Sequence, residues 1–239
     1  METLQNKRCL VTGGTRGIGL AISRMLLEEG ARVVISGRTQ PSVDRADTVL
    51  GAGMGDKVKG KAADLRNHGE VEELFRYADS CLGGLDVLVN NAGVGQFGHA
   101  GELRIEDWRN TIETNLYGGF FCSRQALSRF ETSGGGFIVN ISSLAGAHAF
   151  AGGAAYNASK FGMTGFSEAM MQDVRSQNVR VGYVMPGSVA TEFGGGESSG
   201  KDWKVWPEDV AEVVRMMLKM PARSLVSRVE IRPSKPKSR

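Results

Sequence analysis

The chain has 239 residues, of which 41% are hydrophobic and 23% charged, a balance typical of a globular protein. Its formal net charge is only +3 and its Lys and Arg residues are spread along the sequence, so we expect no nucleic-acid partner. No stretch approaches the roughly 18 apolar residues of a membrane span, and the N-terminal segment lacks the apolar core of a signal peptide.

Strand-like and helix-like segments alternate from one end of the chain to the other. Short, mostly apolar segments predict strands at 8–12, 31–36, 86–90, 137–141, 179–185 and 225–232, and a weaker signal predicts a third strand at 57–62. Helical spacing of apolar residues predicts helices at 18–29, within 41–56, and at 68–82, 106–131, 154–177 and from Pro207 onward. No composition break interrupts the alternation, so we expect one α/β domain over residues 1–239, with 233–239 as a flexible tail. Its seven-stranded sheet should be doubly wound and mostly parallel, with helices on both faces.

A glycine-rich loop joins the first predicted strand to the first predicted helix. Its sequence, T-G-G-T-R-G-I-G, runs from Thr12 to Gly19 and has the spacing G-x-x-x-G-x-G. Gly13 and Gly17 permit a tight turn and a close approach of the backbone, and Gly19 allows the helix to pack on the sheet. Because a helix N-terminus presents free N–H groups, we expect this loop to bind the pyrophosphate of a dinucleotide. The alternative is a glycine-rich turn without a ligand.

The end of the second predicted strand indicates which dinucleotide is bound. A carboxylate there, about 20 residues after the loop, would bind a ribose 2′-hydroxyl. Here the strand is followed by Arg38, and no carboxylate occurs before Asp44. Arg16 adds a second guanidinium within the glycine loop. Two guanidiniums suit a 2′-phosphate, so we predict NADP(H) rather than NAD(H). The alternative is that Arg38 only balances surface charge.

Tyr156 and Lys160 stand four residues apart in the helix predicted over 154–177, which places them one turn apart on the same face. A tyrosine has a pKa of about 10, and a nearby positive charge lowers it. We therefore expect Lys160 to lower the pKa of Tyr156 so that the phenol can exchange a proton near neutral pH. An ordinary surface pair is the alternative, although Tyr156 alone among the four tyrosines has a Lys at the fourth position on.

Several short motifs occur in a fixed order along nearly the whole chain. They are T-G-x-x-x-G-x-G at 12–19, Asp64, N-N-A-G at 90–93, Asn115, Ser143 thirteen residues before Tyr156, Y-x-x-x-K at 156–160, and P-G-x-x-x-T at 186–191. In these motifs and spacings the chain resembles the classical short-chain dehydrogenase/reductase family. The resemblance implies a Rossmann-like fold and hydride transfer between nicotinamide and a carbonyl or secondary alcohol, with a small molecule as substrate.

The resemblance also implies a catalytic set of four side chains. Tyr156 would exchange a proton with the substrate oxygen, and Ser143 would hydrogen-bond that oxygen. Lys160 would bind the nicotinamide ribose and depress the tyrosine pKa. Asn115 would hold a water that links Lys160 to solvent; the alternative is that it only satisfies backbone groups at a helix irregularity. By spacing alone, Ser142 is an alternative to Ser143.

The same resemblance implies which residues bind NADP(H). Asp64 would face the adenine, residues 91–93 would pass beside the adenine ribose, and residues 186–191 would flank the nicotinamide. The implied cofactor-binding residues are Gly13, Thr15, Arg16, Gly17, Ile18, Gly19, Arg38, Asp64, Leu65, Asn91, Ala92, Gly93, Tyr156, Lys160, Pro186, Gly187, Val189 and Thr191.

The chain departs from many family members after its last predicted helix. L-V-S-R-V-E-I-R-P stands at 225–233, where T-G-x-x-x-x-V-D-G-G is common, so contacts built from that ending are not expected here. The segment 192–206 would be the substrate lid, and its residues 194–202 look flexible. The alternative is a solvent-exposed loop whose tryptophans pack against the body of the protein. Family likeness implies a homodimer or homotetramer packed through the helices at 106–131 and 154–177.

Cys9, Cys81 and Cys122 lie far apart in the sequence. Their spacing matches no metal site or disulfide framework, so we expect no bound metal and a reducing, cytoplasmic location. Two functional alternatives stay open at this point. One is an NAD-dependent alcohol dehydrogenase of the same family, and the other is a dinucleotide sensor that has lost catalysis.

Overall fold

The computed structural model describes residues 1–193 and 203–235. Its centre is a seven-stranded sheet with the order β3-β2-β1-β4-β5-β6-β7. Every adjacent pair of these strands is parallel, which confirms the predicted doubly wound, Rossmann-like α/β fold. The strands are β1 (Arg8–Val11), β2 (Arg32–Gly37), β3 (Val58–Ala62), β4 (Val87–Asn90), β5 (Gly136–Ile141), β6 (Val179–Pro186) and β7 (Arg228–Ile231).

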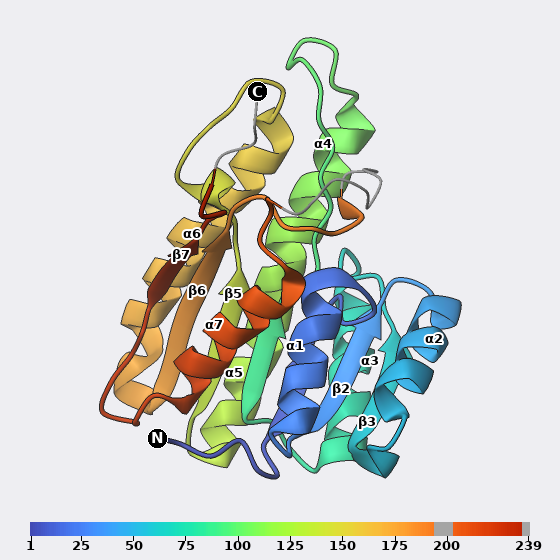
Figure 1. Cartoon of the computed structure of the whole chain (residues 1–239), viewed down its shortest axis with the longest axis vertical. Coiled ribbons are helices and arrows are strands. Elements are labelled where there is room, and N and C mark those ends of the chain that lie inside the picture. The colour runs from blue at the N-terminus through green and yellow to red at the C-terminus, as the bar shows by residue number, and fades with distance from the viewer. Residues whose placement is uncertain (194–202, 236–239) are drawn as a thin grey trace.

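Helices cover the sheet on both faces (Figure 1). One face carries α1 (Gly17–Glu28), α2 (Gln40–Gly51) and α7 (Pro207–Lys219). The other carries α3 (His68–Leu82), α5 (Gly118–Ser133) and α6 (Ala154–Val174). Among the described helices, none combines the length and apolar character that crossing a bilayer requires.

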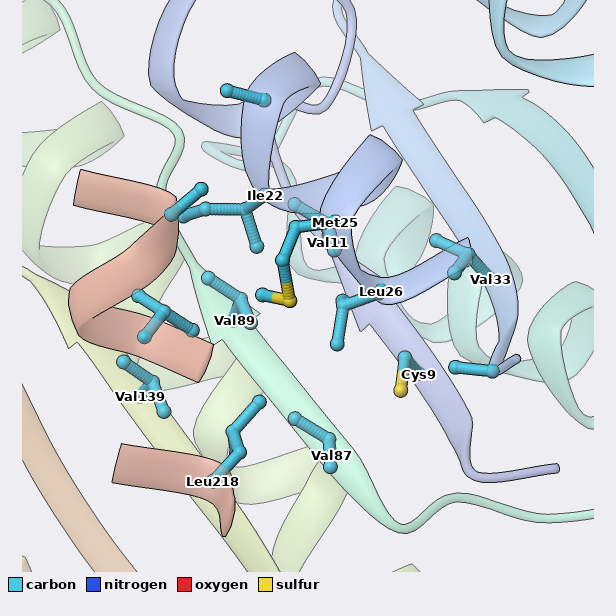
Figure 2. Packing of buried hydrophobic residues seen from close by; sticks show 14 of the residues in the cluster. Cys9, Val11, Ile22, Met25, Leu26, Val33, Val87, Val89, Val139 and Leu218 are labelled. Carbon is cyan, nitrogen blue, oxygen red and sulfur yellow. The ribbon is translucent and has the colours of Figure 1, made fainter. Parts of the chain in front are cut away.

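Successive residues of a strand enter opposite cores. Val11 and Val89 pack beneath α1 and α7, where Figure 2 shows them beside Ile22 of α1. Leu10 and Leu88, their neighbours in sequence, belong to the core on the other face. Side chains alternate along a strand, so a strand covered on both faces must be apolar throughout. This requirement explains the continuous apolar runs that predicted β1 and β4.

The region predicted as one regular helix at 106–131 is interrupted. It consists of α4 (Ile105–Ile112), a π-helical turn η2 (Glu113–Tyr117) and α5. The turn contains Asn115, whose side chain bonds the backbone of Val94 from another part of the chain. A π-turn holds one extra residue, and the spacing of apolar residues gives no sign of such an insertion.

The last strand is shorter than the predicted 225–232. Pairing with β6 begins only at Arg228, opposite Tyr183. Before that point the chain lies across β6, where a Cβ on Gly182 would come within 2.8 Å of the Val226 carbonyl oxygen. Of the predicted tail at 233–239, residues 236–239 lie outside the described part of the chain.

The chain reverses direction in the sheet between β1 and β4. From β1 it winds outward to β3, crosses back to β4, and then winds outward the other way to β7 (Figure 1). In an open parallel sheet, ligands bind beyond the carboxyl ends of the strands at such a switch point. The glycine loop follows β1 and the N-N-A-G motif closes β4, so the topology brings these two motifs together.

Candidate active site

Lys160 and Tyr156 lie together on α6, as the sequence predicted. The Lys160 Nζ is 5.8 Å from the centroid of the Tyr156 ring. It also donates a hydrogen bond of 2.9 Å to the carbonyl oxygen of Ile141, the last residue of β5. Lys160 is only 5% exposed. The ammonium group is therefore fixed between the end of a central strand and the phenol ring.

Two adjacent serines follow β5, and they face different surroundings. The Ser143 hydroxyl hydrogen-bonds the Tyr156 side chain, and it accepts a 3.1 Å bond from the Ala145 N–H. The Ser142 hydroxyl is buried and lies 3.1 Å from Thr164 Oγ1 on the body of α6. This geometry favours Ser143 as the hydroxyl that can reach a reacting group.

The expectation that Lys160 lowers the pKa of Tyr156 is wrong for this structure. Burial raises the pKa of Tyr156 above its usual value, and the hydrogen bond with Ser143 opposes that rise only in part. Burial also lowers the pKa of Lys160 to about 8. Desolvation disfavours the charged form of both groups, an effect that the spacing of two residues along a helix does not reveal.

Replacing Lys160 by Met should stabilise the folded protein near neutral pH. Burial lowers the pKa of Lys160 from 10.5 to about 8, so between these pH values the folded state binds fewer protons than the unfolded state. Stability of the wild type therefore rises with pH across this window, and the cost of burying the charge is greatest below it. We expect Lys160→Met to exceed the wild type by about 1–3 kcal/mol at pH 7 and by less at pH 10. Urea unfolding at both pH values measures this difference, and a variant less stable than the wild type at pH 7 would contradict it.

Asn115 connects the loop after β4 to α6. Its Oδ1 accepts a 2.7 Å bond from the Val94 N–H, and its Nδ2 donates to the Val94 carbonyl at 2.8 Å. The same Nδ2 donates to Ser159 Oγ at 2.9 Å, and the Ser159 hydroxyl donates to the Tyr156 carbonyl at 2.8 Å. The side-chain amide of Asn115 thus positions the backbone around Tyr156. The predicted water beside Asn115 stays a prediction.

The glycine loop is held against the end of β4 by Asn91. The Asn91 Nδ2 donates to the carbonyls of Thr12 and Gly13, each at 3.0 Å. A Cβ on Gly13, where φ is +61°, would lie 2.8 Å from Ala92 Cα, and a Cβ on Gly19 would lie 2.2 Å from the Gly13 carbonyl oxygen. Side chains at these two glycines would therefore separate the loop from β4.

The predicted cofactor residues at the start of α1 meet the segment that follows β6. Arg16 at the N-cap makes no side-chain capping bond, which leaves the first-turn N–H groups of α1 to other partners. Gly17 opens the helix with φ +53°, and a Cβ there would lie 3.1 Å from Thr191 Cγ2. The motifs at 12–19 and 186–191, far apart in sequence, therefore meet at this helix end.

Arg16 and Arg38, the two residues predicted to bind the 2′-phosphate, lie beside a contact between the glycine loop and the end of β2. A Cβ on Gly37, at the end of β2, would lie 2.6 Å from Thr15 Cγ2. Arg38 follows Gly37 and Arg16 follows Thr15, and both guanidiniums are exposed. Arg16 also approaches Glu192 at 3.5 Å, an exposed ion pair of small energetic weight.

Asp64, predicted to face the adenine, is held by a neighbouring arginine. The Arg66 Nε donates to both Asp64 carboxylate oxygens, at 2.9 and 3.0 Å, and Arg66 Nη1 donates to Asn110 Oδ1 at 3.1 Å. The bond with Arg66 holds the Asp64 pKa below its usual value, and the charge of Arg38 adds to the effect. Asp64 thus lies on the same side of the site as Arg38. Leu65, beside it, is buried.

The segment 186–191, predicted to flank the nicotinamide, contacts both Ser143 and the C-terminal strand. The Ser143 hydroxyl donates to the Pro186 carbonyl at 3.4 Å, and the Gly187 N–H donates to the Ile231 carbonyl at 2.8 Å. Val189 forms an isolated bridge with Val205. Of the predicted lid at 192–206, residues 194–202 lie outside the described part of the chain.

Asn157, which no sequence motif singled out, shapes the loop before α6. Its Nδ2 donates to the Ala145 carbonyl at 2.7 Å and the His148 carbonyl at 3.1 Å, and its Oδ1 accepts from the Phe150 N–H at 3.3 Å. The side chain is 7% exposed. An amide directly after Tyr156, in a helix otherwise opened by alanines, was the available signal.

Replacing Asn157 by Ala should lower the free energy of unfolding by about 1–3 kcal/mol, because it removes partners from buried backbone groups. Urea unfolding measures the loss. Asn110→Ala, which removes an exposed bond from Arg66 and a long 3.5 Å bond from the Thr114 hydroxyl, serves as the control and should change stability by less than about 0.5 kcal/mol. Equal effects of the two substitutions would show that Asn157 does not hold the loop.

Two aromatic side chains from other segments, which no sequence motif identified, contact Tyr156. The rings of Phe97 and Phe193 each have their centroids 5.6 Å from that of Tyr156. Phe97 comes from the loop after β4, and Phe193 follows the motif at 186–191. The contacts depend on segments about 60 and 40 residues from Tyr156, so no local pattern could identify them.

Comparisons with known proteins agree with this arrangement. The sequence matches a family model described as short chain dehydrogenase over residues 7–202. It is 30% identical over 233 residues to an uncharacterized oxidoreductase of Staphylococcus aureus (strain N315), an alignment that covers 98% of this chain and 100% of the relative.

Two solved structures share the whole fold. An alcohol dehydrogenase from the archaeon Thermococcus sibiricus, complexed with 5-hydroxy-NADP, has a TM-score of 0.88 and 28% identity, with 97% of this chain and 99% of that chain covered. A metagenomic short-chain oxidoreductase in complex with NADP has a TM-score of 0.85 and 33% identity, with 98% and 100% covered. As its motifs predicted, the chain belongs to the short chain dehydrogenase family.

Proposed function

We propose that this protein is an NADP(H)-dependent oxidoreductase that interconverts a carbonyl compound and a secondary alcohol, with Tyr156 as the general acid or base. The observation that carries the proposal is the meeting of the Tyr156 phenol, the Ser143 hydroxyl and the Lys160 ammonium group. They lie at the carboxyl edge of the sheet, where the glycine loop also lies.

The backbone around the site fits a dinucleotide. A Cβ on Gly93 would lie 3.3 Å from Asn115 Oδ1 and 3.7 Å from Lys160 Nζ, so the absence of a side chain there leaves the backbone open beside the catalytic groups. The uncapped start of α1 offers N–H groups and a positive dipole end to the pyrophosphate. When bound, the nicotinamide supplies or accepts the hydride.

The other predicted cofactor-binding residues would contact different parts of the dinucleotide. Asp64 and Leu65 would contact the adenine, and residues 91–93 its ribose. Residues 186–191 would flank the nicotinamide. Arg16 and Arg38 would bind the 2′-phosphate, and the NADP-type ligands of the two similar structures support this choice over NAD(H).

In the proposed reaction, Tyr156 exchanges the proton with the substrate oxygen, and neighbouring side chains assist the transfer. In reduction, the substrate carbon receives the hydride while the Tyr156 O–H transfers its proton to the substrate oxygen. The Ser143 hydroxyl donates a hydrogen bond to the same oxygen. Lys160 would bind the nicotinamide ribose beside the phenol, and Asn115 holds the backbone around Tyr156. In oxidation the same groups act in reverse, with the phenolate accepting the alcohol proton.

Consumption of NADPH and of NADH with a panel of aldehydes and ketones tests the function. We expect turnover with NADPH, and a clear preference for it over NADH. A preference for NADH would favour the NAD-dependent alternative. Tight binding of NADPH without turnover of any carbonyl compound or alcohol would favour a catalytically silent sensor.

We further propose that two copies of the chain associate through the helices at 105–133 and α6. Tyr117 and Phe120, large apolar side chains in this region, are 50% and 43% exposed. Burying such rings against a second copy would remove apolar surface from water. Light scattering after size-exclusion chromatography measures the oligomeric state. Association is expected, and Phe120→Asp should weaken it; a monomer at micromolar concentration would contradict the proposal.

A further inference from the structure

The geometry points to a substrate class: Phe97, Phe150 and Phe193 form an aromatic lip that selects planar aryl ketones, and the matching alcohols, over saturated ones. This inference rests on the proposed function, because it places the substrate carbonyl at Tyr156. The aromatic lip consists of these three rings and is defined by their contacts with one another and with Tyr156.

The four rings form a continuous series. The centroid of Phe150 lies 6.0 Å from that of Phe97, at an interplanar angle of 43°. Phe97 meets Tyr156 at 5.6 Å and 66°, and Tyr156 meets Phe193 at 5.6 Å and 53°. These separations and tilts are those of favourable aromatic pairs. An aryl group that enters beside Tyr156 can therefore pack against these rings in the same way as the rings pack against one another.

The lip presents apolar surface to solvent directly beside the reactive phenol. Phe97, Phe150 and Phe193 are 49%, 48% and 43% exposed. Their half-exposed rings come from three different segments, yet all belong to the series of rings around Tyr156. Exposed apolar side chains that cluster in this way indicate a binding site, whereas single apolar residues scattered over a surface do not.

The backbone holds the rings in place. Gly95 lies between two of them, because a Cβ there would come within 2.7 Å of both Phe97 and Phe193. The loops that carry Phe97 and Phe150 are tied by a 2.9 Å bond from the Gly98 N–H to the Gly152 carbonyl. A lip fixed before the substrate arrives favours a flat, rigid ligand, which loses little conformational freedom on binding.

Two charged groups on the described segments beside the lip lie in ion pairs. Glu192, next to Phe193, contacts Arg16 at 3.5 Å. Arg232, which approaches His148 on the loop before Phe150, is bound to Glu230 at 2.7 Å. The Arg232–Glu230 pair leaves neither charge free for a ligand, which favours an uncharged group beside Phe150.

The test compares 1-tetralone with 1-decalone, which have the same bicyclic carbon skeleton but differ in the aromatic ring. With NADPH, we expect the wild type to favour 1-tetralone in kcat/KM. Phe97→Leu and Phe150→Leu should each lower this preference about 3- to 10-fold, the range expected for loss of an aromatic pair. Gly95→Ala, which keeps all three rings but displaces two of them, should also lower it. Met216→Leu, at a 42% exposed position on α7, is the control and should leave the preference unchanged.

A binding measurement separates this inference from the proposed function. Tyr156→Phe, mixed with NADP⁺, is titrated with each ketone by calorimetry. Tighter binding of 1-tetralone, weakened by adding Phe150→Leu, would support the lip even if no variant turned over. Turnover of both ketones with equal kcat/KM, or a preference that Phe97→Leu and Phe150→Leu leave intact, would overturn the inference while leaving the oxidoreductase proposal standing.

Discussion

Tyr156→Phe is expected to lower kcat by a factor of about 10³ or more while leaving the Kd for NADPH within about twofold of the wild type. The substitution removes one oxygen atom, so the ring contacts with Phe97 and Phe193 remain. The lost hydroxyl is the group from which the substrate oxygen would take its proton. Steady-state kinetics and a fluorescence titration with NADPH measure the two quantities separately.

The chain contains a matched control for this experiment. Tyr77 also has a lysine beside its ring, with the Lys61 Nζ 5.8 Å from the centroid, the same distance as in the Tyr156–Lys160 pair. Tyr77 is not part of the proposed catalytic set, so Tyr77→Phe should leave kcat unchanged. If Tyr156→Phe retained more than about a tenth of the wild-type kcat, Tyr156 would not be the proton donor.

Arg38→Asp should raise the KM for NADPH by about 100-fold and change that for NADH by much less. The guanidinium would lose its charge-assisted bonds to the 2′-phosphate, and the new carboxylate would repel that group. The same carboxylate can accept a bond from the 2′-hydroxyl of NADH. The ratio of kcat/KM for the two cofactors is the quantity to measure.

Arg24→Asp changes charge by the same amount at another exposed position, on α1, and serves as the control. It should alter the ratio by less than about threefold, since exposed charges at a distance are screened by salt. Equal losses for NADPH and NADH in Arg38→Asp would show that this arginine does not bind the 2′-phosphate.

The elements best predicted from sequence are those that local signals define. The helix expected at 68–82 has the same bounds as α3, because Asn67 caps its start and Gly83 ends it in a left-handed conformation. The inner strands β1, β2, β4 and β5 were predicted well because burial on both faces requires largely apolar runs. Similarly, the glycine loop and the order of motifs predicted which segments meet at the carboxyl edge of the sheet.

The details that sequence reasoning missed depend on contacts that form only once the loops are folded. The pKa of Tyr156 is set by burial, which no spacing between Tyr156 and Lys160 reports. The part played by Asn157 depends on three backbone groups of the preceding loop. The aromatic lip forms only because Phe97, which precedes Tyr156 in the sequence, and Phe193, which follows it, both contact the Tyr156 ring. Such features become visible only when the fold has placed the loops.

The π-turn at Glu113–Tyr117 gives the region between α4 and α5 an unusual sensitivity to chain length. Within a helix, one extra residue rotates every later residue about the helix axis by about 100°. Deleting a single residue here would restore a regular helix, yet it would turn the Asn115 amide away from Val94 and Ser159 or turn the apolar face of α5 away from its core. The site therefore depends on the number of residues in this turn as well as on their identity. A change that removes no side chain from the catalytic set could still dismantle it.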